Sequence, residues 1–298
     1  MREKWCARRD LNPGRQRGRL NPVTLSLNWL QNKGEFLEYM QSKRYNVRYV
    51  QCILAYLDKN VRELREPMDI VRIFAKLSQG QQHNLNRAMR AFLNFQELKG
   101  VAPDYLNALR KAIPQDCVGV DLKVPMESEI LASLRRLNVM PLKYQALYNL
   151  LLDSGLRLTE GVRLINQFES PTAVQGFYRC TLGYFRGSKL AYAAYFTPFT
   201  FELIQRNPEK VDDRTASHYF YKFKYVAPKY LRKFAFDTMI SEGFNIPESV
   251  ADFIEGRVPI KIGAKHYSAL IRQADSFYER YASYLSKLRG ACCQVPAT

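Results

Sequence analysis

Apolar residues in the first third of the chain recur at spacings of three and four, which is the period of an amphipathic α-helix. Pro67 stands where a first helical turn begins, and Gly80 and Gly100 stand where two of these runs stop. The pattern predicts four or five short helices between residues 27 and 112, enough for a compact all-helical domain. The apolar positions of the clearest run are Val47, Val50, Ile53, Leu54, Leu57, Val61 and Leu64.

The pattern changes further along the chain. Residues 113–125 contain two prolines and a glycine without a helical period, which predicts a linker. Residues 177–185 and 190–196 are rich in aromatic and β-favouring residues, and Gly187 lies between them, which predicts a β-hairpin. Helical period is found on both sides of this hairpin, over residues 127–137, 142–152, 229–242, 248–255 and 268–288.

These elements predict a mostly helical α+β protein with a small antiparallel sheet. We expect two folded domains, and neither an internal repeat nor a low-complexity tract is visible. The predicted segments are a flexible basic arm (1–26), a helical domain (27–112), a linker (113–125), a mixed catalytic domain (126–290) and a tail (291–298).

The charge of the chain narrows the class of partner. Forty-five Lys and Arg stand against 28 Asp and Glu, a formal net charge of +17. Such a surplus favours a polyanion, most often nucleic acid, because cations that contact phosphates release condensed counterions. A basic surface of the ribosomal or membrane-surface kind is the alternative that charge alone leaves open.

The six cysteines and three histidines point away from several other classes. No Cys-x-x-Cys pair occurs, which argues against a zinc site and a secreted disulfide framework. The uncharged run 190–201 contains Pro198 and is too short to span a bilayer. We therefore expect a soluble cytoplasmic, nucleoid-associated protein with reduced thiols, no cofactor, no metal ion, no membrane contact and no small-molecule substrate.

Three short motifs and one turn carry candidate chemistry. The first motif is Ser154-Gly155-Leu156-Arg157-Leu158-Thr159-Glu160, and the second is Lys229-Tyr230-Leu231-Arg232 after Pro228. The third is Glu255-Gly256-Arg257, followed ten residues later by Tyr267. Lys189 lies at the predicted hairpin turn, with Arg186 as a less favoured substitute. Each motif by itself also fits a solvated basic face, and the chain has 19 tyrosines.

Taken in order, these motifs resemble those of the tyrosine recombinases. The family usually has His where Lys229 stands and His or Trp where Arg257 stands. These two replacements look most like archaeal integrases of the fusellovirus and plasmid type. The resemblance covers about residues 27–288, and it implies a SAM-like helical core-binding domain followed by a tyrosine-recombinase catalytic domain. The matching positions, in chain order, are Arg157, Lys189, Lys229, Arg232, Arg257 and Tyr267.

The resemblance also implies roles for these residues. Arg157, Arg232 and Arg257 would hold the scissile phosphate, and Glu160 would steady the loop that carries Arg157. Tyr267 would be the nucleophile that forms a 3′-phosphotyrosine. Lys189 would protonate the leaving 5′ oxygen, and Lys229 would assist proton transfer. A phenol has a pKa of about 10, so a cluster of cations is needed both to activate it and to stabilise the charge on phosphorus.

Partners follow from the same resemblance. Double-stranded DNA carrying attachment sites is the expected substrate, and four protomers are expected in the synaptic complex. The helix after Tyr267 is a candidate for contact between protomers, although its apolar face could equally pack on its own domain. Two rivals remain open: a type IB topoisomerase-like relaxing enzyme, and a DNA-binding protein whose recombinase fold has lost catalysis.

The basic arm suggests a target. Residues Arg9 to Pro13 can be encoded by NGG-GAT-TTG-AAC-CCN, whose core is the reverse complement of GGTTCAAATCC, the common T-arm sequence of transfer RNA genes. Integrases of the type named above place their attachment site within their own reading frame, overlapping a transfer RNA gene. We hypothesise that residues 6–18 reflect a DNA site of this kind; a basic DNA-binding tail is the compatible alternative.

Overall fold

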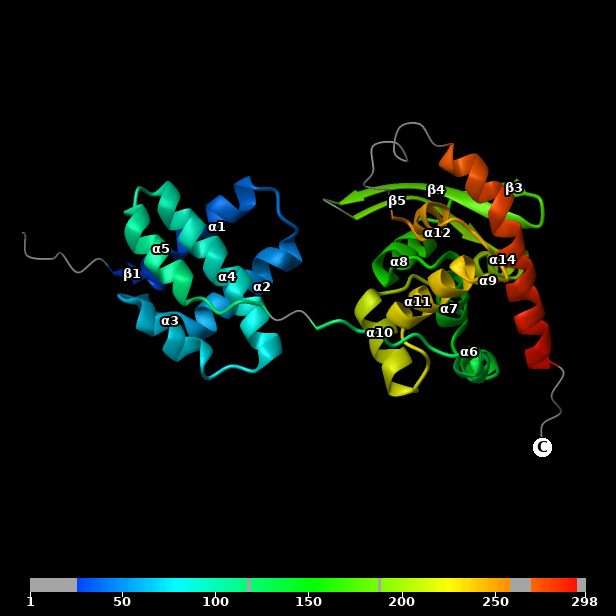
Figure 1. The fold of residues 1–298 in the computed structure, drawn as a ribbon, viewed down its shortest axis with the longest axis horizontal. Coiled ribbons are helices and arrows are strands. Elements are labelled where there is room, and N and C mark those ends of the chain that lie inside the picture. Colours follow the sequence, from blue (N-terminus) through cyan, green and yellow to red (C-terminus); the bar gives the residue numbers. More distant parts are fainter. Residues whose placement is uncertain (1–25, 117–118, 187–188, 258–268, 294–298) are drawn as a thin grey trace, which may run out of the picture. The chain divides into compact units, whose positions relative to one another are not determined.

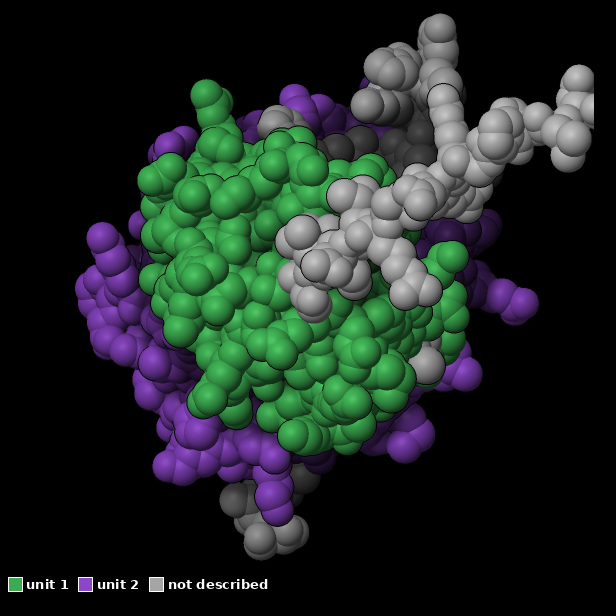
Figure 2. Space-filling model, turned by 90° about the vertical axis from the view of Figure 1, so that its left-hand side faces the viewer, with its two compact units in different colours: residues 1–120 green, residues 121–298 purple. Residues whose placement is uncertain are grey.

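A computed structural model describes residues 26–116, 119–186, 189–257 and 269–293. The chain divides into two compact units, residues 1–120 and residues 121–298, which Figure 2 distinguishes by colour. The predicted basic arm up to residue 25, Tyr267 and most of the tail lie outside the described residues. Among the described helices, none is long and apolar enough to cross a membrane.

The described residues of the first unit form five helices and a small two-stranded sheet (Figure 1). Its core is aromatic: Trp29 packs edge-to-face on Phe36 and Phe92, with ring centroids 5.4 Å apart in both pairs. The strands β1 (Leu27–Asn28) and β2 (Glu63–Leu64) pair antiparallel. The helices are α1 (Trp29–Ser42), α2 (Val47–Asn60), α3 (Pro67–Phe74), α4 (Gln79–Leu98) and α5 (Pro103–Ala112).

Two predicted boundaries in this unit are wrong. The helix that begins at Val47 does not reach Leu64, because α2 ends at Asn60 and Leu64 lies in strand β2. Gly80 does not end a helix; α3 ends at Phe74, and Gly80 lies in the first turn of α4. The reason is a capping box, in which the Ser78 backbone N–H donates to Gln81 Oε1 at 3.0 Å and so starts a new helix just before the glycine. Gly100 follows the end of α4 with φ +84°, as expected for a glycine that terminates a helix.

The second unit contains the remaining helices and a three-stranded antiparallel sheet of order β3-β4-β5. The predicted hairpin is confirmed, with Arg186 and Lys189 paired at the end of β4 and β5. The strands are β3 (Thr172–Val174), β4 (Phe177–Arg186) and β5 (Lys189–Phe196). The helices are α6 (Glu127–Leu134), the 3₁₀ turn η1 (Leu137–Val139), α7 (Leu142–Ser154), α8 (Leu158–Asn166), α9 (Pro198–Arg206), α10 (Asp213–Lys222), α11 (Pro228–Ile240), α12 (Glu248–Ile254) and α14 (Leu270–Cys293).

Helix α7 is the centre of this unit. Almost every residue from Tyr144 to Ser154 is buried, because α8, α9, α11 and β5 all pack around the helix. A helix buried on all sides needs apolar residues on all sides, and its sequence LKYQALYNLLLDS has them. The C-terminal end of α7 therefore has a fixed position, and the loop that follows it carries the first candidate motif.

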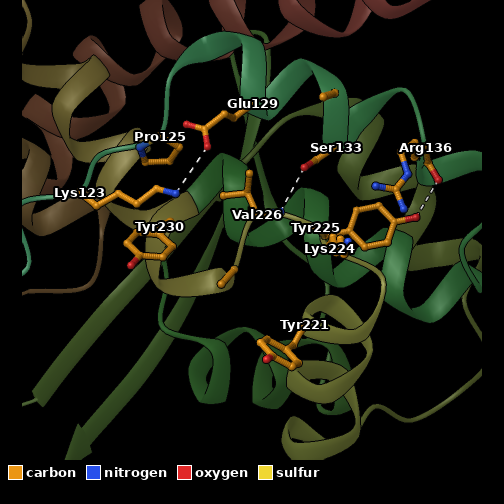
Figure 3. Close-up of a pocket in the computed structure, with 12 residues that line it drawn as sticks. Lys123, Pro125, Glu129, Ser133, Arg136, Tyr221, Lys224, Tyr225, Val226 and Tyr230 are labelled. Carbon is orange, nitrogen blue, oxygen red and sulfur yellow. Dashed lines mark hydrogen bonds and ion pairs between the residues drawn. The ribbon is translucent and has the colours of Figure 1, made fainter.

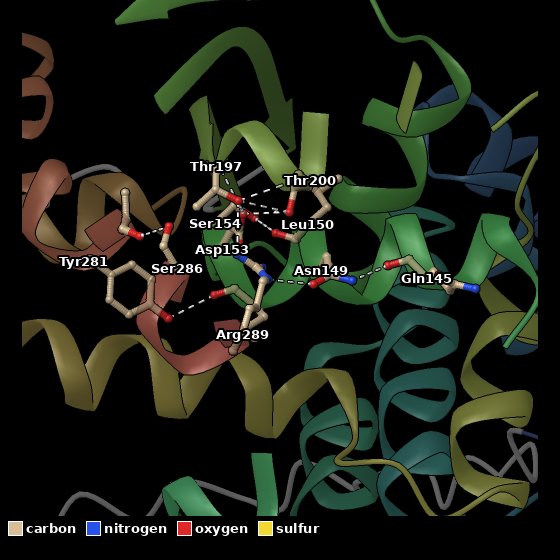
Figure 4. A network of polar contacts seen from close by, with 12 residues as sticks. Gln145, Asn149, Leu150, Asp153, Ser154, Thr197, Thr200, Tyr281, Ser286 and Arg289 are labelled. Atoms are coloured by element: carbon tan, nitrogen blue, oxygen red, sulfur yellow. Dashed lines mark hydrogen bonds and ion pairs between the residues drawn. The ribbon is translucent and has the colours of Figure 1, made fainter. Parts of the chain in front are cut away.

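The C-terminal helix α14 packs on its own unit (Figure 1). Tyr278 and Tyr281 are fully buried, and their hydroxyls donate to the carbonyls of Asp153 and Leu152 at 2.9 and 3.0 Å. Arg289 forms an ion pair with the buried carboxylate of Asp153, which also accepts hydrogen bonds from Thr197 and Thr200 (Figure 4). This polar network ties α14 to the last turn of α7.

Candidate active site

The turn between α7 and α8 presents Arg157. Gly155 ends α7 with φ +60°, a conformation that side chains other than glycine rarely adopt. Arg157 is the N-cap of α8, and its backbone N–H donates to Glu160 Oε2 at 3.0 Å. Its Nη1 donates to Glu160 Oε1 at 2.7 Å, so a single carboxylate fixes both the main chain and the side chain of Arg157.

Arg232 joins this turn to a second one. It projects from α11, is only 8% exposed, and its Nη1 donates to the carbonyls of Gly155 at 2.7 Å and Glu255 at 2.6 Å. Its Nη2 has no hydrogen-bond partner within the described residues. Burial, together with the nearby charges of Arg157 and Arg257, lowers the pKa of Arg232 to about 10, which leaves it protonated at neutral pH.

Arg257 completes the cluster from the end of α12. Gly256 has φ +75°, and a Cβ there would lie 2.9 Å from Ala191 Cβ on β5, so the turn needs glycine for both conformation and space. Arg257 contacts Asp252 at 2.9 Å. The turn also accepts a long hydrogen bond, 3.4 Å, from Arg157 Nη1 to the Gly256 carbonyl. The structure therefore brings together arginines from three distant segments of the chain.

Glu255 lies between these arginines. Its carboxylate is 0% exposed, and its Oε2 lies 3.4 Å from Arg232 Nη2 and 3.3 Å from Arg257 Nη2. Burial without a hydrogen bond to either oxygen raises the pKa of Glu255 to about 7, against the opposing pull of the arginines. The cluster is thus three guanidinium groups with one buried acid in their midst.

A comparison with known families decides the class of protein. Residues 122–284, more than half of the chain, match the family model of archaeal phage integrases. The chain belongs to the archaeal phage integrase family. It is accordingly a site-specific recombinase that acts on DNA.

Two solved structures are similar to this integrase at low identity. The integrase from mycobacterium phage Brujita is 12% identical with a TM-score of 0.38, and the similarity covers 83% of this chain and 91% of that chain. A XerA recombinase is 17% identical with a TM-score of 0.34, covering 83% of this chain and 97% of that chain. No protein of curated function matches the chain.

The other predicted site residues have different placements in the integrase. Lys229 lies in the first turn of α11 and is exposed; its Nζ lies 3.0 Å from Asp121 Oδ2 and 4.5 Å from the centre of the Tyr230 ring. This hydrogen bond from Lys229 is the main reason that the pKa of Asp121 falls to about 2. Lys189 opens β5 at the hairpin turn, where the structure describes its backbone but not its side chain. Tyr267 lies outside the described residues.

Sequence reasoning gave Glu255 no role, although it stands in the third motif. The available signal was an acid directly before Gly-Arg, where a carboxylate can neutralise the arginine that follows. Within the described ranges, no group of three or more His, Cys, Asp or Glu side chains is placed to hold a metal ion.

A basic and aromatic pocket lies beside the start of α11 (Figure 3). Its volume is about 490 Å³, and the N-terminal end of α11 adjoins it at Ala227. Lys123 lies over the Tyr230 ring at 5.3 Å, and Arg136 over the Tyr225 ring at 4.8 Å. Lys224, exposed and with φ +54°, adds a third cation to the lining.

Proposed function

We propose that the integrase cleaves and rejoins DNA by transesterification, with Tyr267 forming a 3′-phosphotyrosine intermediate. The convergence of Arg157, Arg232 and Arg257 on one pair of turns carries this proposal. Guanidinium groups hold the non-bridging oxygens of a phosphate and keep their protons while charge builds on phosphorus. Such preorganised donors contribute most to a reaction of this kind, because they need no rearrangement as the charge develops.

The three arginines differ in exposure and therefore in how each can contact a phosphate. The side chains of Arg157 and Arg257 are 28% and 44% exposed, so both can reach a phosphate that arrives from solvent. Arg232 is buried and uses Nη1 to hold the two turns together; its Nη2 is also buried in the DNA-free protein, so it must be uncovered before it can donate to the phosphate. Glu160 keeps Arg157 in place through two hydrogen bonds.

Proton transfer is assigned to the two lysines. Lys189, at the tip of the hairpin, protonates the leaving 5′ oxygen as a general acid. Lys229 assists where the family usually has His; to do so it must leave Asp121, and an exposed ion pair of this kind costs little to break. The cations together lower the pKa of the Tyr267 phenol, which otherwise remains protonated at neutral pH.

The substrate in this proposal is an attachment site that overlaps a transfer RNA gene, bound by four protomers on two DNA duplexes. The codons that Arg9 to Pro13 permit support the choice of site, since they can spell the T-arm sequence. Reading the nucleotide sequence of the gene over codons 6–18 tests it. Codons that do not spell GGATTTGAACC would refute the proposed attachment site in a transfer RNA gene. They would not affect the proposed role of Tyr267.

Replacement of Tyr267 by Phe is expected to abolish recombination between two marked attachment sites. It removes only the oxygen that becomes esterified, so DNA binding remains. The assay scores excision of the intervening DNA, and Tyr45→Phe, which removes an exposed hydroxyl outside the pocket beside α11, should recombine like the wild type. Excision by Tyr267→Phe at the wild-type rate contradicts the proposal. If the wild type relaxes supercoiled DNA without excising the intervening DNA, the result favours a type IB topoisomerase-like enzyme. If the wild type forms no covalent adduct, the result favours a DNA-binding protein whose recombinase fold has lost catalysis.

The pocket beside α11 is proposed to contact the DNA backbone near the cleavage site. Lys224→Ala should weaken binding to all DNA sequences alike and reduce the slope of log K against log salt by about one. Lys210→Ala removes an exposed lysine that does not line the pocket, and it serves as the matched control. Fluorescence anisotropy over a range of salt concentrations measures both slopes. Equal slopes for Lys224→Ala and the wild type would remove this pocket from the interface.

A further inference from the structure

Glu255 is a buried acid whose carboxylate is paired with arginines but accepts no hydrogen bond from a described residue. Its charged partners Arg232 and Arg257 lie at 3.4 and 3.3 Å, and no donor within the described residues makes a hydrogen bond to either carboxylate oxygen. An ionised carboxylate is costly to bury unless it is both paired and hydrogen-bonded. An apolar side chain would fill the same volume but would leave the buried Arg232 without its ion-pair partner, so the arginines around it account for an acid here.

We propose that Glu255 is the counter-ion of the arginine cluster in the DNA-free protein, and that it takes up a proton when a DNA phosphate enters the cluster. The negative charge that holds the guanidinium groups is then supplied by the substrate. This inference rests on the proposed function, since it requires the phosphate to bind these arginines. Glu255 is a positioning residue in this account, because it acts on DNA only through Arg232 and Arg257.

The geometry favours protonation over movement of the side chain. Glu255 lies directly against Gly155, where a Cβ would meet its Cγ at 2.8 Å and its Oε1 at 2.9 Å. The residue is fully buried, and its own carbonyl accepts the hydrogen bond from Arg232 at 2.6 Å. The carboxylate therefore cannot turn away from an incoming phosphate without opening the core, and loss of its charge is the less costly response.

The surrounding charges determine how readily that proton is taken up. Among the described residues, the charged or titratable side chains that face Glu255 are Arg232 from α11, Asp252 and Arg257 at the end of α12, Arg157 ahead of α8 and Tyr281 from α14. Burial raises the pKa of Tyr281 well above its ordinary value, so it stays neutral. Asp252 and Glu160 offset part of the positive charge on Arg257 and Arg157.

These charges, together with burial, place the pKa of Glu255 close to neutral pH. Burial holds its pKa at about 7 without DNA, so the acid is mostly ionised at pH 8. A phosphate on the neighbouring arginines adds negative charge and raises that pKa further. The proton comes from the solvent and forms the carboxylic acid O–H, and no other bond forms or breaks.

Isothermal titration calorimetry in buffers of different ionisation enthalpy counts the protons taken up on binding. The probe is a duplex that contains GGTTCAAATCC, and every protein carries Tyr267→Phe so that no cleavage contributes. At about pH 8 we expect uptake of about one proton per occupied site with Glu255 present, and almost none with Glu255→Gln. Asp252→Asn removes a carboxylate that is partly exposed at the same cluster, and it should retain the uptake.

A DNA-free measurement separates this inference from the proposed function. A carboxyl group whose pKa is raised in the folded state stabilises the fold at low pH, and this contribution is lost as pH rises through the folded pKa. The thermal midpoint of the wild type should therefore fall between about pH 4.5 and pH 7 relative to that of Glu255→Gln, and the difference should stay constant above that range.

The outcomes of the two measurements distinguish failure of the inference about Glu255 from failure of the proposed function. Parallel thermal midpoints for wild type and Glu255→Gln overturn the inference whether or not DNA binds. Equal proton uptake by the two proteins also overturns it, even if the wild type forms a covalent adduct. Uptake that is lost only in Glu255→Gln supports it. Failure of the wild type to form any adduct, with the thermal difference present, refutes the proposed function and leaves the buried counter-ion established.

Discussion

Strand cleavage is expected to fall about a hundred- to a thousandfold when Arg232 is replaced by Lys. Lysine keeps the positive charge but ends in a single ammonium group, which cannot bridge the carbonyls of Gly155 and Glu255 and also reach a phosphate. Lysine is chosen over alanine because it retains a charge beside the buried Glu255. Single-turnover formation of the covalent complex on a nicked duplex measures the rate.

Arg206→Lys is the matched control for this variant. Arg206 is exposed at the end of α9, and the same change there should leave the cleavage rate within twofold or so of the wild type. Binding of the duplex by Arg232→Lys should weaken much less than its cleavage rate, because the lost interaction strengthens as charge develops on phosphorus. Cleavage by Arg232→Lys at the wild-type rate would show that the cluster does not hold the reacting phosphate.

The largest expected effect on stability comes from Arg289→Ala. Arg289 is 11% exposed and donates to Asn149 Oδ1 and Thr197 Oγ1 at 3.0 Å each, besides its ion pair with Asp153 (Figure 4). Its removal leaves the buried Asp153 without a counter-charge, which costs about 3–5 kcal/mol in the free energy of unfolding. Urea denaturation followed by circular dichroism measures the change.

Arg280→Ala gives the comparison on the same helix. Arg280 is exposed on α14, and its one hydrogen bond to the described part of the chain goes to the Phe244 carbonyl, at 2.9 Å, so its loss should cost no more than about 1 kcal/mol. Because α14 follows the segment that carries Tyr267, Arg289→Ala should also slow formation of the adduct. Equal stability of the two variants would mean that the network does not hold α14 on α7.

The fold was predictable from the sequence wherever an element was long enough to show a period. The hairpin of β4 and β5 and the helices α6, α7, α11, α12 and α14 follow the pattern of apolar and β-favouring residues, whereas α8 and α9 were not predicted. The strands β1, β2 and β3 were missed, since two or three residues show no period. Gly80 was misread because the capping side chain of Ser78 outweighs the low helix propensity of one glycine.

The site was predictable only in its local parts. The turn that carries Arg157 can be read from seven consecutive residues, because Gly155 and Glu160 act within that turn. The placement of Glu255 depends on the convergence of α7, α11 and α12, and no single segment encodes it. The ion pair of Lys229 with Asp121 likewise joins a helix to the predicted linker, 108 residues earlier in the chain.

We propose that a phenol oxygen of this chain becomes esterified to a DNA phosphate held by the arginine cluster. Trapping the covalent complex on a suicide substrate, digesting it, and locating the nucleotide by mass spectrometry tests this claim most directly. We expect a phosphodiester on Tyr267 and on no other residue. A nucleotide on a different side chain, or on none in a protein that binds the substrate, would contradict it.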